Sequence, residues 1–163
     1  MKNTYELRWV WLLVMAATVG LILQQSTLPP QQSAEASDAV TKIVVPIVGG
    51  PETTLGGFFE RFMRKIAHFV EFFILGAEAG CYLFRRVRAV TLSLLSLFGL
   101  AVASADELLQ RFTGRGPAVT DVLLDLAGYL AGLGLFLGLL TLAAWLYNKR
   151  KEGAPPRAET NDA

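Results

Sequence analysis

The chain has 163 residues, of which 53% are hydrophobic and 18% are charged, and its formal net charge at pH 7 is +1. A soluble domain of this size carries more charge and does not sustain long apolar runs. The near-neutral balance, without a basic stripe interleaved with aromatic residues, gives no reason to expect nucleic acid as a partner. The composition therefore indicates an integral membrane protein.

Four apolar stretches dominate the sequence, at residues 9–23, 66–84, 90–105 and 122–147. A helix rises about 1.5 Å per residue and needs about 20 residues to cross a hydrocarbon core of ~30 Å. The second and fourth stretches have about this length, and the first and third reach it with their flanking residues. We therefore predict an all-α, polytopic membrane protein with four transmembrane helices.

Basic residues next to these stretches predict the orientation in the membrane. They form three clusters: Lys2 and Arg8; Arg85, Arg86 and Arg88; and Lys149, Arg150 and Lys151. Four crossings place all three clusters on one side, and an excess of Lys and Arg marks the cytoplasmic side. Both termini are therefore expected in the cytoplasm. The predicted organisation is a cytoplasmic N-terminus at 1–8, a first transmembrane helix at 9–28, an extracytoplasmic loop at 29–57, a core with helices two to four at 58–147, and a disordered cytoplasmic tail at 148–163.

The extracytoplasmic loop is rich in Gln, Ser, Gly and Pro, which is typical of irregular structure. Within it, residues 38–45 either form a short helix on the outer membrane surface or belong to an unstructured linker. Its length suits a lid over an outward-facing site. A signal peptide cleaved near residues 33–36 is the alternative to a retained first helix, but that position lies well past the apolar run. We expect the first helix to be retained as an anchor or packing wall.

The start of the second helix carries ionisable residues on one face. Lys65, His68 and Glu71 follow one another at steps of three residues, which places them on one side of a helix. Snorkelling of long side chains to the outer interface is sufficient to explain Arg61 and Arg64. The other three lie progressively deeper, where ionisable residues normally have partners and a function.

The third helix ends in a polar segment. Asp106 and Gln110 are four residues apart, and Glu107 and Gln110 are three apart, so the faces that they occupy overlap. The glycines and the proline of residues 114–117 then predict a turn, with Arg115 at its tip. We expect the acidic pair at the outer end, level with the polar face of helix two.

The fourth helix begins with another polar stripe. Asp121, Asp125, Gly128 and Gly132 follow at steps of four, three and four residues. A helix cap explains Thr120 or Asp121 but not Asp125, which lies one turn further in. The two glycines form a small-xxx-small pair that allows another helix to approach closely beneath the carboxylates.

Helix periodicity and topology together collect these residues in one outward-facing polar layer. We assign acid–base chemistry to Glu107 or Asp106 as base and to His68 as acid or orienting partner. The remaining residues fall into two groups, with Lys65, Glu71, Gln110 and Arg115 binding a phosphate or carboxylate headgroup and Asp121 and Asp125 as a positioning pair.

Three kinds of function fit such a layer. It can form an intramembrane enzyme acting on a lipid or lipid-linked envelope precursor, a non-enzymatic site that binds a lipid headgroup or glycopeptide or modulates an envelope enzyme, or an ion-pair network that locks the helices together. Buried ion pairs add little net stability, which disfavours the third. A divalent metal could bind through His68, Glu107, Asp121 and Asp125. One histidine with scattered carboxylates and no HExxH spacing is a weak signal, so no metal or other cofactor is predicted.

Three sequence blocks resemble the VanZ-like family of bacterial membrane proteins: RKIAHFVEFFILG from Arg64, SADELLQRFTGRG from Ser104, and TDVLLDLAGYLAG from Thr120. The resemblance covers residues 62–137 and includes the order and spacing of the blocks. Many relatives have a DExHQ motif, where this chain has Leu109 in place of the histidine. The family pattern carries over to Lys65, His68, Glu71, Asp106, Glu107, Gln110, Arg115, Asp121, Asp125 and Gly128.

What the resemblance implies is a role in the bacterial cell envelope. The founding member of the family is associated with resistance to teicoplanin, a lipoglycopeptide that binds cell-wall precursors. The expected location is accordingly the bacterial cell membrane, with several passes and the site facing the extracytoplasmic side. The expected partner is a membrane lipid or a lipid-linked precursor. The resemblance supplies no reaction.

Overall fold

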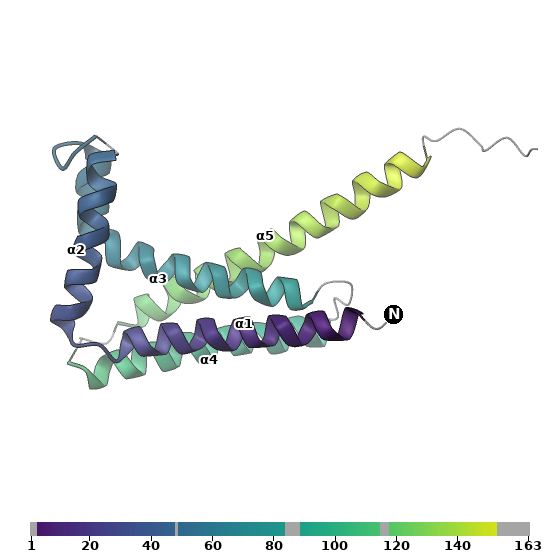
Figure 1. Cartoon of the computed structure of the whole chain (residues 1–163), viewed down its shortest axis with the longest axis horizontal. Helices are drawn as coiled ribbons and strands as arrows, with labels where there is room; N and C mark the ends of the chain where they lie inside the picture. The colour runs from purple at the N-terminus through teal and green to yellow at the C-terminus, as the bar shows by residue number, and fades with distance from the viewer. Residues whose placement is uncertain (1–2, 48, 84–88, 115–117, 153–163) are drawn as a thin grey trace, which may run out of the picture.

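The computed structural model describes residues 3–47, 49–83, 89–114 and 118–152, and over these ranges all regular structure is α-helical. This confirms the predicted all-α class. α1 and α4 run side by side, α2 stands across one end of them, and α5 crosses the bundle and extends beyond it (Figure 1). The helices are α1 (Asn3–Ser26), α2 (Pro30–Ile47), α3 (Thr54–Tyr82), α4 (Ala89–Phe112) and α5 (Val119–Glu152).

Three of the described helices contain segments long and apolar enough to cross a membrane: Arg8–Ser26, Ala89–Phe112 and Val119–Lys151. α3 lacks such a segment because Lys65, Glu71 and Glu78 interrupt its apolar part. Three of the four predicted spans thus have a matching helix. The remaining span, predicted at residues 66–84, and the membrane topology stay predictions.

The two ends of the bundle differ in character. The guanidinium of Arg8, near the start of α1, lies 4.5 Å from the ring centre of Tyr82 at the end of α3. At the opposite end, Ser26 of α1 donates a hydrogen bond to Asp106 near the end of α4. α1 and α4 therefore run in the same direction and α3 runs against them, as Figure 1 also shows.

The crossing of α3 and α5 depends on glycines that the sequence analysis singled out. A Cβ atom added at Gly128 would lie 2.5 Å from the carbonyl oxygen of Phe69 in α3, and one at Gly132 would overlap the carbonyl oxygen of Phe73. No side chain fits between the two backbones at these positions. Small residues of this kind allow membrane helices to pack by direct backbone contact.

The core lies where α3, α4 and α5 meet with α1. Tyr129 of α5 is fully buried, its ring lies against Gly99 of α4, and its hydroxyl donates a 2.9 Å hydrogen bond to the carbonyl of Leu95. A buried tyrosine hydroxyl usually finds such a partner. The other core residues are Met15, Ile22, Phe72, Leu75, Ala79, Leu83, Val102, Ala103 and Leu133.

Two predicted irregular segments are helical. α2 begins at Pro30 and spans 18 residues, well beyond the expected 38–45. Proline suits the first position of a helix, and the Gln, Ala and Glu residues that looked loop-like are good helix formers. α5 continues to Glu152, so the expected disordered tail from residue 148 was wrong for its first five residues, where Lys and Arg favour a helix C-terminus. Residues 153–163 lie outside the described part.

α1 does more than form an apolar wall. Thr18, midway along it, donates a 2.9 Å hydrogen bond to Glu78 of α3, and Ser26 reaches Asp106 of α4. Hydrogen bonds between helices hold membrane bundles together where the hydrophobic effect does not. α1 is therefore bonded to the core at two levels.

Candidate functional site

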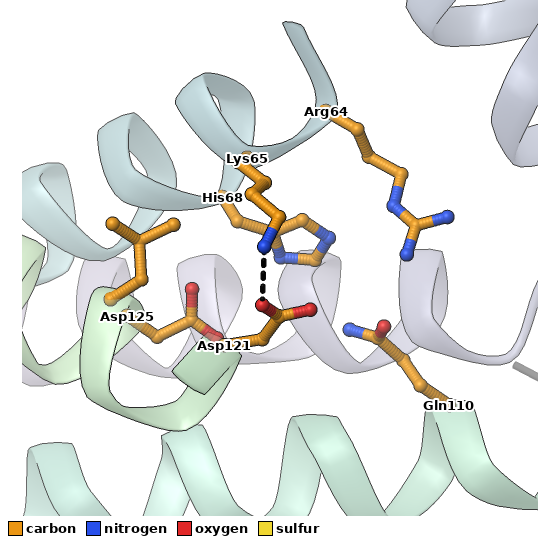
Figure 2. A pocket seen from close by; sticks show the side chains of 7 residues that line it. Arg64, Lys65, His68, Gln110, Asp121 and Asp125 are labelled. Atoms are coloured by element: carbon orange, nitrogen blue, oxygen red, sulfur yellow. Dashed lines mark hydrogen bonds and ion pairs between the residues drawn. The ribbon is translucent and has the colours of Figure 1, made fainter. Parts of the chain in front are cut away.

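A small polar pocket opens at the end of the bundle where α3, α4 and α5 converge. In Figure 2, side chains from all three helices point into it, with the basic residues coming from α3 and the carboxylates from α5. The residues lining it are Arg64, Lys65, His68, Gln110, Asp121, Leu124 and Asp125. Five of these seven were predicted site residues, brought together from positions up to 60 residues apart in the chain.

Asp106 lies behind this pocket and is fully buried. Its Oδ1 accepts a hydrogen bond from the Ser26 hydroxyl, and its Oδ2 accepts one of 2.7 Å from Nε2 of Gln110. His68 Nδ1 lies 3.6 Å from the same Oδ2. Two donors therefore hold the carboxylate in place, with one of its oxygens directed at the imidazole. Buried polar groups in native structures normally have such hydrogen-bond partners.

The mouth of the pocket is basic and more exposed. Lys65 Nζ forms a 2.9 Å ion pair with Asp121 Oδ1, and the two side chains are 51% and 25% exposed (Figure 2). Arg64 beside them is exposed. An ion pair this accessible to solvent contributes about 1 kcal/mol or less to stability. Its cation can exchange its partner for an incoming anion at little cost.

The floor of the pocket combines one imidazole with two carboxylates. Atoms of His68, Asp106 and Asp125 that can bind a metal lie within 4.8 Å of one another. Asp125 is 2% exposed, and neither its Oδ1 nor Nδ1 of His68 has a hydrogen-bond partner. Buried polar atoms without partners are rare in native structures. The floor therefore holds two buried polar atoms that make no hydrogen bond within the described residues.

Glu107 is not among the residues that line the pocket. Its Oε1 accepts a 2.7 Å hydrogen bond from the backbone N–H of Ala118, at the start of α5, and its Oε2 has no partner. A carboxylate at a helix N-terminus satisfies a free N–H and interacts favourably with the helix dipole. Of the two acidic residues assigned as the base, the structure brings Asp106, and not Glu107, next to His68.

The remaining predicted site residues lie at the edge of the cluster. Glu71 of α3 is half-buried and is not among the residues that line the pocket. Arg115 lies outside the described residues. Gly128 and Gly132 lie one and two turns after Asp125 in α5, where this helix crosses α3. This close crossing positions the Asp125 carboxylate relative to His68.

Sequence reasoning missed three residues of the site. Arg64 was assigned to the membrane interface, Leu124 was counted as an ordinary apolar residue, and Ser26 was placed near the end of the first transmembrane helix with no role in the site. A serine directly after an apolar run has no signal of its own, because only the packing of α1 against α4 shows its partner. Arg64 could have been found from its spacing, because it lies four residues before His68 and so on the same face of the helix.

The fold and site define a class: a helical membrane protein with a buried polar site at one end of its bundle. Within that class, residues 9–142 match the VanZ/LLP1 family, and the chain belongs to this family. The match confirms the resemblance carried by the three sequence blocks. Comparisons with curated proteins and with solved structures found no match.

Proposed function

We propose that this family member binds the anionic headgroup of a lipid or lipid-linked envelope precursor, from the extracytoplasmic side of the bacterial membrane. The observation that carries the proposal is the basic mouth of Arg64 and Lys65 over a buried polar floor, set among helices that would lie in lipid. Ionisable residues at membrane depth are costly and usually mark a functional site.

The chemistry of the mouth suits a phosphate or carboxylate. An arginine guanidinium presents a planar fork of N–H donors that binds two oxygens of such a group, and a lysine ammonium adds a mobile point charge. The pocket is small, so it would hold the charged group of a headgroup while the lipid tails stay outside. A lipid-linked cell-wall precursor is the ligand that would connect the site with glycopeptide resistance.

The direction of the helices supports the proposed outward orientation. Arg8 lies at the end of the bundle opposite to the pocket. The last residues of α3 and α5 lie at the same end, and in the sequence the other two basic clusters lie at or directly after these helix ends. If that end is cytoplasmic, as an excess of Lys and Arg indicates, the pocket faces the outside.

Native mass spectrometry of the protein in nanodiscs tests this function. With phosphatidylglycerol as the probe in a phosphatidylcholine background, we expect Lys65→Gln to reduce retained phosphatidylglycerol about tenfold, because a hydrogen bond to a charged group contributes about 1.5–3 kcal/mol. Lys42→Gln is the matched control, since Lys42 is an exposed lysine of α2 outside the pocket. Equal retention of phosphatidylglycerol by both variants would rule out the pocket as its binding site.

A further inference from the structure

We propose that His68, Asp106 and Asp125 form a divalent-metal site at the floor of the pocket. This inference rests on the proposed headgroup function, which it deepens by naming what else holds the anion. The three residues come from α3, α4 and α5, so one ion would join the three helices that form the pocket.

The donor set and spacing suit a first-row transition metal. One imidazole nitrogen and two carboxylate oxygens lie within 4.8 Å of one another, so an ion with bonds of about 2.0–2.2 Å can reach all three after small side-chain rotations. Imidazole favours ions such as Zn²⁺, and carboxylates also suit Mn²⁺. Three protein ligands leave a coordination position open, which is typical of catalytic rather than structural metal sites.

Two buried atoms of the proposed ligand residues make no hydrogen bond within the described part of the chain. Nδ1 of His68 and Oδ1 of Asp125 are buried without a hydrogen-bond partner. Leaving a buried donor or acceptor unpaired costs about 1–3 kcal/mol. A metal ion bound by both atoms removes this cost, and it requires the neutral imidazole that ordinarily binds metals.

The balance of charge at the floor also calls for a cation. In the described part of the chain, Lys65 pairs with Asp121, and neither Asp106 nor Asp125 forms an ion pair with a lysine or arginine. Two buried carboxylates this close repel each other and would repel an anionic headgroup. A divalent ion neutralises both and turns the floor into a place where a phosphate oxygen can bind.

The surroundings of Asp106 resemble those of a metal ligand. Ser26 and Gln110 each donate a hydrogen bond to one of its oxygens, which fixes the orientation of the carboxylate. Partners of this kind orient ligands in metal sites, and their loss typically costs 10–100-fold in metal affinity or activity. With the fourth position open toward the pocket, the ion would act as a Lewis acid on a bound phosphate.

Cobalt titration of the metal-stripped, full-length protein in detergent tests the site. We expect one equivalent of Co²⁺ to bind, with visible absorption bands typical of four or five ligands, and Zn²⁺ to displace it. Asp125→Asn should weaken Co²⁺ binding by more than about 100-fold, beyond the loss of 10–100-fold that is typical for an outer partner. Asp125→His supplies another ligand and should keep the absorption bands. Asp38→Asn, which removes an exposed carboxylate of α2 outside the pocket, should bind Co²⁺ as the wild type does.

The inference is overturned if the wild-type protein binds less than stoichiometric Co²⁺, or if Asp125→Asn binds it as well as Asp38→Asn does. Repeating the phosphatidylglycerol measurement after metal removal separates the two proposals. If retention of phosphatidylglycerol depends on Lys65 but the protein binds no metal, the metal proposal alone is ruled out. If the protein binds one equivalent of metal but retention of phosphatidylglycerol does not depend on Lys65, the headgroup proposal alone is ruled out.

Discussion

Gly132→Ala should lower the free energy of unfolding by about 1–3 kcal/mol, the range expected for overpacking a well-packed interface. The added methyl group would overlap the carbonyl oxygen of Phe73, which is backbone and cannot move without shifting α3. Since Asp125 lies on the same face of α5, the shift would also pull its carboxylate away from His68. Thermal unfolding in detergent, followed by size-exclusion chromatography, measures the loss.

Gly134→Ala provides the matched control for this prediction. Gly134 lies two residues along the same helix, and a Cβ added there meets nothing within 4 Å. Alanine has a higher helix propensity than glycine, by up to about 1 kcal/mol, so this variant should be as stable as the wild type or more so. If the two variants unfold at the same temperature, direct backbone contact does not hold α3 and α5 together.

Asp106→Ala should lower the free energy of unfolding by about 2–4 kcal/mol, because it removes the acceptor of two buried hydrogen bonds and leaves the donors of Ser26 and Gln110 unpaired. Both the abundance in the membrane and the unfolding temperature should fall. Asp106→Asn keeps the shape and one acceptor oxygen, so it should recover part of the loss. The exposed Asp38 of α2 provides the control, and Asp38→Ala should change neither quantity.

A mild effect of Asp106→Ala would contradict this account of Asp106. Should the variant accumulate and unfold like the Asp38 control, the hydrogen bonds from α1 and α4 would not hold the carboxylate, and the floor of the pocket would be adaptable. The unfolding temperature decides this independently of any binding measurement.

Helical periodicity predicted much of the site. The three-residue steps of Lys65, His68 and Glu71 placed them on one face of α3, and the same reasoning placed Asp121 and Asp125 together on α5. These relations lie within single helices, where sequence spacing determines which side chains are neighbours. Their convergence also followed from the order of the helices.

Relations between helices were harder to predict. Asp106 and Glu107 are adjacent in the sequence and lie four and three residues before Gln110. Asp106 nevertheless faces His68, whereas Glu107 faces the start of α5. That choice depends on the rotation of α4 about its axis, and this rotation depends on contacts with other helices, such as the packing of Tyr129 on Gly99. No pattern within residues 104–111 contains this information.

The charges of α3 affected two predictions in opposite ways. They correctly marked the polar face of the pocket, but they also leave this helix without a segment apolar enough to qualify as a membrane span. The prediction of four spans placed the charges of α3 in the membrane because partners were expected for them. The partners are present in Asp121 and Asp106, whereas the position of α3 in lipid stays a prediction.

Alkylation of a cysteine inside the pocket tests the central claim most directly. Leu124→Cys, in a Cys81→Ser background that removes the only native cysteine, places a reporter among the lining residues. We predict that a membrane-impermeant maleimide labels it from outside intact cells, and that in nanodiscs added phosphatidylglycerol slows labelling unless Lys65 is replaced by Gln. Labelling only from the cytoplasmic side, or a rate that does not respond to the anionic lipid, would contradict an outward-facing headgroup site.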